Sequence, residues 1–163
     1  MDKQKSEVLR LLTENARYSN KQIADMLNLP ESAVATIVSE LEKSGAIVKY
    51  SAIINNEVLK DSVVEALIEV KVAPQKLMGF DSYAEELYHF PEVRTLYLMS
   101  GGFDLAIFVQ GDNIGEIAKF VSAKLSVIEG IIGVQTHFVL KKYKVEGQVT
   151  ASDIKREREI IQA

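Results

Sequence analysis

The order of hydrophobic patterns along the chain constrains its fold more than any other feature. Up to about residue 45 the apolar side chains recur at helical spacing, whereas from residue 63 onward β-rich runs and helical segments alternate. Strands are predicted at residues 63–72, 93–99, 105–109 and 134–143, and helices at residues 80–90 and 113–125. The order β-α-β-β-α-β predicts a ferredoxin-like sandwich, in which two helices cover one face of a four-stranded antiparallel sheet. A second copy of the same sheet would cover the other face in a symmetric dimer.

The first 45 residues predict three short helices, so the whole chain is expected to be α+β. Residues 3–14 carry apolar side chains at helical spacing, Ser19 and Gln22 form a capping box before a second helix, and Gly45 ends a third. The turn before the third helix is short, as in a helix-turn-helix, and a strand predicted at residues 46–54 would make it a winged variant. A plain three-helix bundle without a role in DNA binding has the same spacing and remains an alternative.

The sequence lacks the residues that many enzymes and metal sites need. It has no cysteine and two histidines, so we expect no disulfide framework, no thiolate or histidine-rich metal site and no nucleophile-histidine-acid set. We therefore predict no cofactor and no enzymatic activity. No apolar run is long enough for a membrane helix and the N-terminus is charged, so we expect a soluble, cytoplasmic protein without membrane contact.

The charge is distributed unevenly along the chain. The net formal charge is −4; residues 1–50 carry seven basic and seven acidic side chains, whereas residues 51–140 carry six basic and twelve acidic ones. DNA-binding domains usually show a basic surface. The balanced N-terminal segment therefore predicts weak, salt-sensitive binding to DNA.

A pair of glycines separates two apolar runs in residues 96–109 (LYLMSGGFDLAIFV). Gly101 and Gly102 leave the backbone N–H groups of the turn uncovered by side chains, and such groups can bind an anion such as a carboxylate. Asp104 is the nearest carboxylate in sequence and would accept a hydrogen bond from an ammonium group. A free amino acid carries both charges. A hairpin that needs glycine for a positive φ is the alternative explanation of the same pair.

Four short motifs, in order, resemble those of the Lrp/AsnC family of feast/famine regulators, and the similarity spans about residues 3–144. They are residues 16–19 (ARYS), 41–48 (LEKSGAIV), 100–104 (SGGFD) and 138–144 (FVLKKYK). The resemblance implies a transcription regulator whose N-terminal domains bind palindromic, double-stranded promoter DNA. It also implies a C-terminal module that dimerises, assembles further, often to octamers, and binds a small effector, typically an amino acid, at the contact between dimers.

The resemblance places the effector site at the glycine turn and on the last strand. The implied effector-binding residues are Ser100, Gly101, Gly102, Phe103, Asp104 and Thr136. Gly102 stands where the family often has aspartate, and Val134 where it often has threonine. These departures predict a less polar pocket or a different ligand.

The third helix is expected to read DNA, with basic residues around it. The expected DNA-binding residues are Arg17, Ser19, Lys21, Ser32, Ala35, Thr36, Ser39, Lys43 and Lys49. Reader helices usually present Arg, Lys, Asn or Gln to base edges, and the family often has two arginines near Ala35 and Thr36. In this chain serine and threonine hydroxyls can still contact phosphates, and the methyl groups of Ala35 and Thr36 can contact thymine methyls.

Four domains are predicted: a winged helix-turn-helix at residues 1–50, a linker strand and hinge at 51–62, an effector-binding and oligomerisation domain at 63–144, and a charged tail at 145–163. The tail has the pattern of a flexible joint followed by a short charged helix, but a solvated tail is the simpler interpretation. Two other functions stay open. One is a ligand-binding assembly whose helix-turn-helix has lost DNA binding, which Ala35 and Thr36 favour. The other is an enzyme resembling the sirohaem decarboxylases. Such an enzyme would need basic and histidine residues around a tetrapyrrole carboxylate, and Arg94 is the one arginine between residues 51 and 140.

Overall fold

The computed structural model describes residues 2–55, 63–73 and 79–150. The chain divides into two compact units, Met1–Ile53 and Ile54–Ala163. Each unit has its own hydrophobic core, so each is described by itself. The predicted hinge falls largely on residues 56–62, and the predicted charged helix on residues 151–163; both stretches lie outside the described residues.

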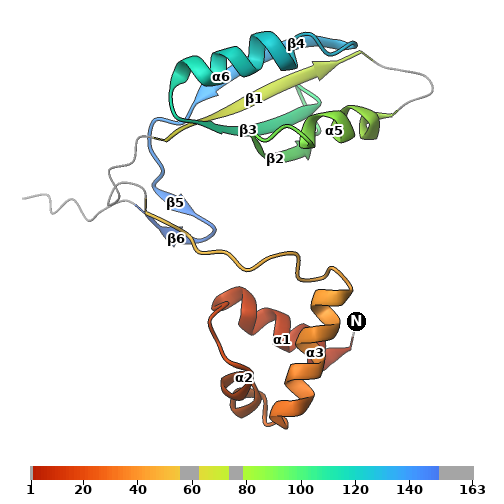
Figure 1. The fold of residues 1–163 in the computed structure, drawn as a ribbon, viewed down its shortest axis with the longest axis vertical. Helices are drawn as coiled ribbons and strands as arrows, with labels where there is room; N and C mark the ends of the chain where they lie inside the picture. The colour runs from red at the N-terminus through yellow and green to blue at the C-terminus, as the bar shows by residue number, and fades with distance from the viewer. Residues whose placement is uncertain (1, 56–62, 74–78, 151–163) are drawn as a thin grey trace, which may run out of the picture. The chain divides into compact units, whose positions relative to one another are not determined.

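The N-terminal unit contains three helices, as predicted (Figure 1): α1 (Lys3–Glu14), α2 (Asn20–Leu27) and α3 (Glu31–Lys43). Their inner faces meet around the fully buried Val8, Ile23 and Val34. Burial of these side chains, and not intrinsic helix propensity, holds helices of 8 to 13 residues together, because isolated helices of this length are marginal in water.

The caps that the sequence predicts in this unit are confirmed. The Gln22 backbone N–H donates to Ser19 Oγ (3.2 Å), and the Ser19 backbone N–H donates to Gln22 Oε1 (2.8 Å), which completes the capping box of α2. Gly45 follows α3 with φ +74°, the left-handed conformation that a glycine C′ residue adopts. Asn28 ends α2 in the same conformation, so the turn into α3 is short and well defined.

The strand predicted at residues 46–54 is wrong for the single chain. No ladder joins this segment to any described strand, and a strand exists only where a neighbour satisfies its backbone groups. The segment is instead attached to α3 at its start: the Ile47 N–H donates to Leu41 O (3.1 Å), and Tyr50 Oη donates to Glu42 Oε1 (3.0 Å). Burial and this hydrogen bond to a carboxylate both raise the pKa of Tyr50.

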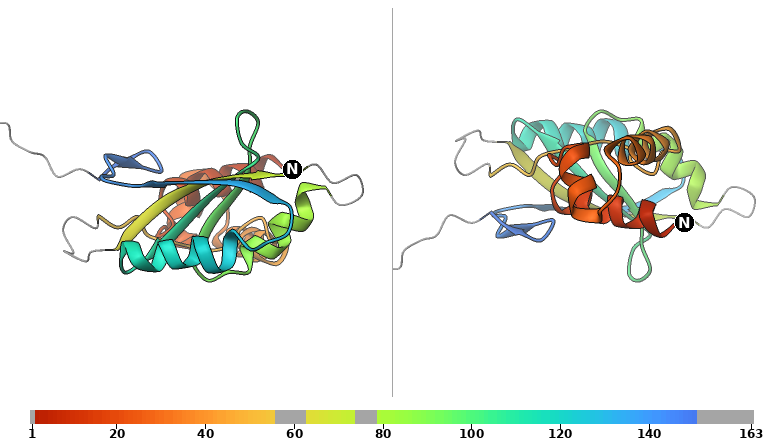
Figure 2. Two further views of the ribbon diagram at one scale, coloured as in Figure 1. Left: turned by 90° about the horizontal axis from the view of Figure 1, so that it is seen from above. Right: turned by 90° about the horizontal axis from the view of Figure 1, so that it is seen from below.

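The C-terminal unit has the predicted β-α-β-β-α-β order. Its elements are β1 (Val64–Val72), α5 (Phe80–Tyr88), β2 (Val93–Leu98), β3 (Leu105–Gly111), α6 (Ile114–Phe120), a π-helical turn (Val121–Leu125) and β4 (Ile131–Phe138). The sheet order is β2-β3-β1-β4, antiparallel throughout, and both helices lie on one face of it (Figure 2, left). This is the ferredoxin-like sandwich that the sequence predicts.

Alternation along β1 decides which side chains enter the core. Ala66, Ile68 and Val70 are fully buried beneath the helices, where they contact Leu87 and Phe120 among others. The intervening side chains of β1 lie on the open face of the sheet. On that face His137 forms an ion pair with Glu69, with 3.2 Å between Nε2 and Oε1.

The second helix of this unit departs from a regular α-helix. The predicted helix of residues 113–125 is capped by Asn113, as expected, but its last turn is π-helical, with the Ser126 N–H donating to Val121 O (2.8 Å). The inward-facing residues are still Ile117, Phe120 and Leu125. The last two are five positions apart, and the wider turn accommodates this spacing.

The end of the chain also differs from the prediction. The last strand begins three residues earlier than expected and ends at Phe138, which pairs with Ala66 of β1. Beyond this pair the Val139 N–H still donates to Glu65 O (2.8 Å). Residues 144–149, expected to be strand end and flexible joint, form a small hairpin of β5 (Lys144–Val145) and β6 (Gln148–Val149). Glu146 and Gly147 turn it, both with positive φ.

Candidate functional site

The glycine loop joins β2 to β3 at the end of the sheet. The Met99 N–H donates to Asp104 O (2.8 Å) and closes the loop, which projects from the sheet on the side away from the helices (Figure 2, left). Gly101 has φ +138° and therefore needs to be glycine, whereas Gly102 has no positive φ. A Cβ on either glycine would meet nothing within 4 Å, so the backbone of the loop is open to a ligand.

Asp104 already has a structural partner. Its Oδ2 accepts a hydrogen bond from the Val72 N–H (2.9 Å), and its own N–H donates to Val70 O (2.9 Å). These bonds give partners to two backbone groups at the end of β1, where the ladder to β4 shifts register between Lys71 and Val72. The expected acceptor of a ligand ammonium is therefore held in place by the fold, and Oδ1 is the oxygen that remains for a ligand.

Thr136 does not join the glycine loop within one chain. It lies opposite Ile68 on β4, on the sheet face that the helices cover, because directly paired residues share a face. β1 separates β4 from β3, and two strand spacings alone come to roughly 10 Å. A site that unites Thr136 with residues 100–104 therefore requires two copies of the chain.

The basic residues of the N-terminal unit divide into two groups. Lys5 pairs with Glu40 (Nζ to Oε2, 2.8 Å) and Arg10 pairs with Glu14 (NH1 to Oε1, 2.6 Å). A second group is exposed and forms no ion pair with the residues that the structure describes; its members are Lys3, Arg17, Lys21, Lys43 and Lys49. All of them except Lys3 were predicted to contact DNA, and their charge is available to phosphates.

The smaller polar residues predicted at the DNA surface are less free. Thr36 Oγ1 donates to Ser32 O (3.0 Å), and Ser19 Oγ serves the capping box. Ala35 and Ser39 are half-buried on α3, whereas Ser32 and Thr36 are exposed. The exposed surface of α3 thus offers hydroxyl and methyl groups between cations, with no long side chain that reads base edges in its centre.

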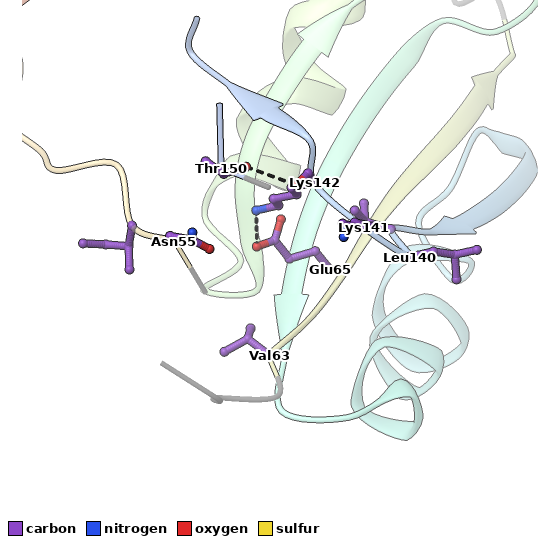
Figure 3. Close-up of a pocket in the computed structure, with 9 residues that line it drawn as sticks. Asn55, Val63, Glu65, Leu140, Lys141, Lys142 and Thr150 are labelled. Carbon is purple, nitrogen blue, oxygen red and sulfur yellow. Dashed lines mark hydrogen bonds and ion pairs between the residues drawn. The ribbon is translucent and has the colours of Figure 1, made fainter. Parts of the chain in front are cut away.

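A cavity of about 270 Å³ lies at the other end of β1, and sequence reasoning did not identify it (Figure 3). Lys142 Nζ forms an ion pair with Glu65 Oε1 there (2.5 Å), and Thr150 Oγ1 donates to Lys142 O (3.1 Å). Thr150 is the one buried polar residue in the described part of the chain. Glu65 and Lys142 are 77 residues apart, so no local pattern in the sequence signals the pair.

The described ranges contain neither a metal-binding cluster nor a membrane-spanning helix. No group of three or more His, Cys, Asp or Glu side chains among residues 2–55, 63–73 and 79–150 is arranged to hold a metal ion. No helix in the same ranges is long and apolar enough to cross a membrane.

Both units match models of known families. Residues 1–48 match a winged helix-turn-helix DNA-binding domain, and residues 65–149 match the Lrp/AsnC ligand-binding domain. The chain is 42% identical to YugG of Bacillus subtilis, an uncharacterized HTH-type transcriptional regulator, over 96% of each chain. It is 32% identical to the HTH-type transcriptional regulator LrpA of Pyrococcus horikoshii, over 88% of this chain and 99% of LrpA.

Solved structures share the fold. A Neisseria meningitidis transcriptional regulator in complex with L-Met aligns with a TM-score of 0.70 at 24% identity, over 91% of this chain and 96% of that one. AsnC of E. coli aligns with a TM-score of 0.68 at 20% identity, over 89% of this chain and 95% of that one. The chain therefore belongs to the Lrp/AsnC family and is a DNA-binding transcriptional regulator with a ligand-binding domain, not an enzyme.

Proposed function

We propose that this regulator docks α3 in the major groove of promoter DNA in the cytoplasm and changes its DNA affinity when an amino acid binds its C-terminal unit. The observation that carries the proposal is the division of cations in the N-terminal unit. The ion-paired Lys5 and Arg10 are neutralised, whereas the predicted contact residues Arg17, Lys21, Lys43 and Lys49 are exposed and free of ion pairs to described residues. A unit with no net charge thus keeps these four cations, and Lys3, for phosphates.

The effector site that we propose lies between copies of the chain. The glycine loop of one copy supplies backbone N–H groups for a carboxylate and Asp104 Oδ1 for an ammonium group, and Thr136 of another copy supplies a hydroxyl. The separation of Thr136 from the loop within one chain supports this arrangement. The L-Met complex of the Neisseria regulator supports an amino acid as the ligand class.

We also propose a homodimer formed by the open face of the sheet, and further assembly to an octamer. Tyr97 and Phe108 lie on this face and form an edge-to-face pair with 6.2 Å between ring centroids. They are 56% and 37% exposed, which is unusual for aromatic side chains on a sheet unless a partner covers them. We propose the same domain bounds as from the sequence: 1–50 for the DNA-binding domain, 51–62 for the linker, 63–144 for the effector-binding domain and 145–163 for the tail.

Fluorescence anisotropy tests the proposal directly. A labelled duplex from the gene's own upstream region is compared with a scrambled duplex of equal length, at two salt concentrations, with and without a pool of the twenty amino acids. We expect preferential binding to the upstream duplex that the pool shifts. Equal, weak binding to both duplexes without a response would instead favour a ligand-binding assembly, consistent with Ala35 and with the Thr36 hydroxyl bonded to its own helix.

The double substitution Lys21→Ala, Lys49→Ala is expected to weaken DNA binding and to make it less dependent on salt. Each phosphate contact contributes about 0.9 to the slope of log K against log salt, so losing two should lower the slope by about 1.8. The matched control is Lys5→Ala, Arg10→Ala, which removes the same charge from cations that already have carboxylate partners. An unchanged affinity and slope in the first variant would contradict this docking model.

A further inference from the structure

A second cavity in the C-terminal unit, of about 230 Å³, lies where β3 ends beneath α6 and the π-helical turn. Its floor is apolar and its rim is polar. The residues that line it are Glu92, Val109, Gln110, Gly111, Glu116, Ile117, Lys119, Phe120, Ala123 and Lys124. Asp104 and Gln110 are six residues apart along β3, so the cavity lies roughly 20 Å from the glycine loop and is separate from the site proposed there.

Glu92 gives this cavity its chemical character. Its Oε1 lies 2.5 Å from Lys124 Nζ, whereas its Oε2 is buried and has no hydrogen-bond donor among the described residues. Burial opposes the charged form of Glu92, but the hydrogen bond and the charge of Lys124 outweigh it, so the pKa of this carboxyl is lowered. The group is therefore a carboxylate at neutral pH, and a buried carboxylate oxygen without a donor is unfavourable.

The surrounding groups do not supply the missing donor. Lys124 is held by Oε1 on one side and by the ring of Phe90 on the other, with its Nζ 5.5 Å from the ring centroid. Gln110 Oε1 accepts a hydrogen bond from Arg94 Nε (2.8 Å), which ties its side chain to the neighbouring strand. Glu116 Oε2 accepts from the Asp112 N–H (2.8 Å), and the buried floor residues Val109, Ile117 and Phe120 are apolar and supply no donor.

We infer that this cavity binds a small molecule with a primary ammonium group on a short apolar chain. The ammonium donates to Glu92 Oε2, and the apolar chain lies within the cavity against its apolar lining. The exposed Lys119 on the rim would also bind the carboxylate of an amino acid, so both a simple alkylamine and an amino acid fit the chemistry. The site lies within one chain and does not depend on the proposed effector site or on DNA binding.

Methyl NMR of the full-length protein tests this inference. The δ1 methyl of Ile117, which lines the cavity, is followed while n-butylammonium chloride, n-butanol and L-norvaline are titrated separately. We expect a saturable shift with n-butylammonium and none with n-butanol, which has the same chain but no charge. Tighter binding of L-norvaline than of n-butylammonium would identify amino acids as the ligands of this cavity, and weaker binding would identify simple amines.

Two variants separate the parts of the site. Glu92→Gln keeps the size of the side chain but removes its charge and should weaken n-butylammonium binding at least about tenfold. Ala123→Phe places a ring from an exposed lining position over the cavity, leaves both charges in place and should abolish the shift. Asp104→Asn, which changes the glycine-loop site, should leave this titration unaltered. A failure of the cavity proposal can therefore be distinguished from a failure of the proposed effector site.

Two outcomes would overturn the inference. One is an equal shift with n-butanol and n-butylammonium, which would mean an apolar hollow without a role for Glu92. The other is no saturable shift below roughly ten millimolar ligand in a wild-type sample whose thermal melt shows it to be folded.

Discussion

Replacing Gly130 by alanine is expected to lower the free energy of unfolding by about 3 kcal/mol. Gly130 has φ +87°, a conformation that costs an alanine roughly 1 kcal/mol. Its new Cβ would also lie 2.0 Å from Tyr83 Oη and 2.9 Å from Tyr83 Cζ. Tyr83 is a buried residue of α5 that faces the core, so its ring cannot move aside freely, and overpacking of this kind typically costs about 1–3 kcal/mol. Chemical denaturation of the two proteins measures the difference.

Two further variants separate the conformational cost of the positive φ from the cost of overpacking against Tyr83. Gly147→Ala has a similar φ (+80°) but no atom within 4 Å of the new Cβ, so it should show only the conformational cost of roughly 1 kcal/mol. Tyr83→Phe removes a hydroxyl that has no hydrogen-bond partner among the described residues, so alone it should be neutral or slightly stabilising. In the double variant Gly130→Ala, Tyr83→Phe most of the overpacking should disappear. Strict additivity of the two changes would mean that the hydroxyl contact is not the cause.

Asp104→Ala is expected to destabilise the C-terminal unit by about 2 kcal/mol, because it leaves the buried end of β1 without the acceptor for the Val72 N–H. Asp104→Asn keeps an oxygen at that place and should cost much less. The two variants should nevertheless lose the amino-acid response to a similar extent, since neither retains the negative charge that an ammonium group requires. Denaturation gives the first comparison, and the anisotropy assay with the amino-acid pool gives the second.

Glu129→Ala is the control for this pair, because Glu129 is an exposed carboxylate in the same unit. It should change neither stability nor the effector response. A full response in Asp104→Asn would show that the carboxylate serves the fold alone, and the ammonium partner would then have to lie on another residue.

The parts of the fold that follow from local sequence were predictable. Ser19 and Gln22 form a capping box because both partners lie within one turn, and alternation in residues 64–72 decides which face of β1 is buried. The strand at residues 46–54 was not predictable in the same way. Its side-chain pattern suits a strand, but pairing depends on a neighbour that the described single chain does not provide.

The sites depend more strongly on contacts between distant residues. The two glycines and Asp104 in residues 101–104 indicated a turn with an open backbone. The hydrogen bond from the Val72 N–H to Asp104, however, joins residues 32 positions apart, so no local sequence pattern could predict it. The same distance separates Glu92 from Lys124, so nothing in the sequence marked the second cavity. Thr136 was assigned to the glycine loop by resemblance, and only the strand order shows that one chain keeps them apart.

The π-helical turn at Val121–Leu125 has a consequence for chain length. The wide turn holds one residue more than an α-helix would need between Phe120 and Leu125. Deleting Ala123 would bring the leucine to the fourth position after Phe120, and the core would be the same with a regular helix. The cavity would change nonetheless, because Ala123 and Lys124 both line it. A shortened chain would therefore keep the core around Phe120 and Leu125 but not the lining of this cavity.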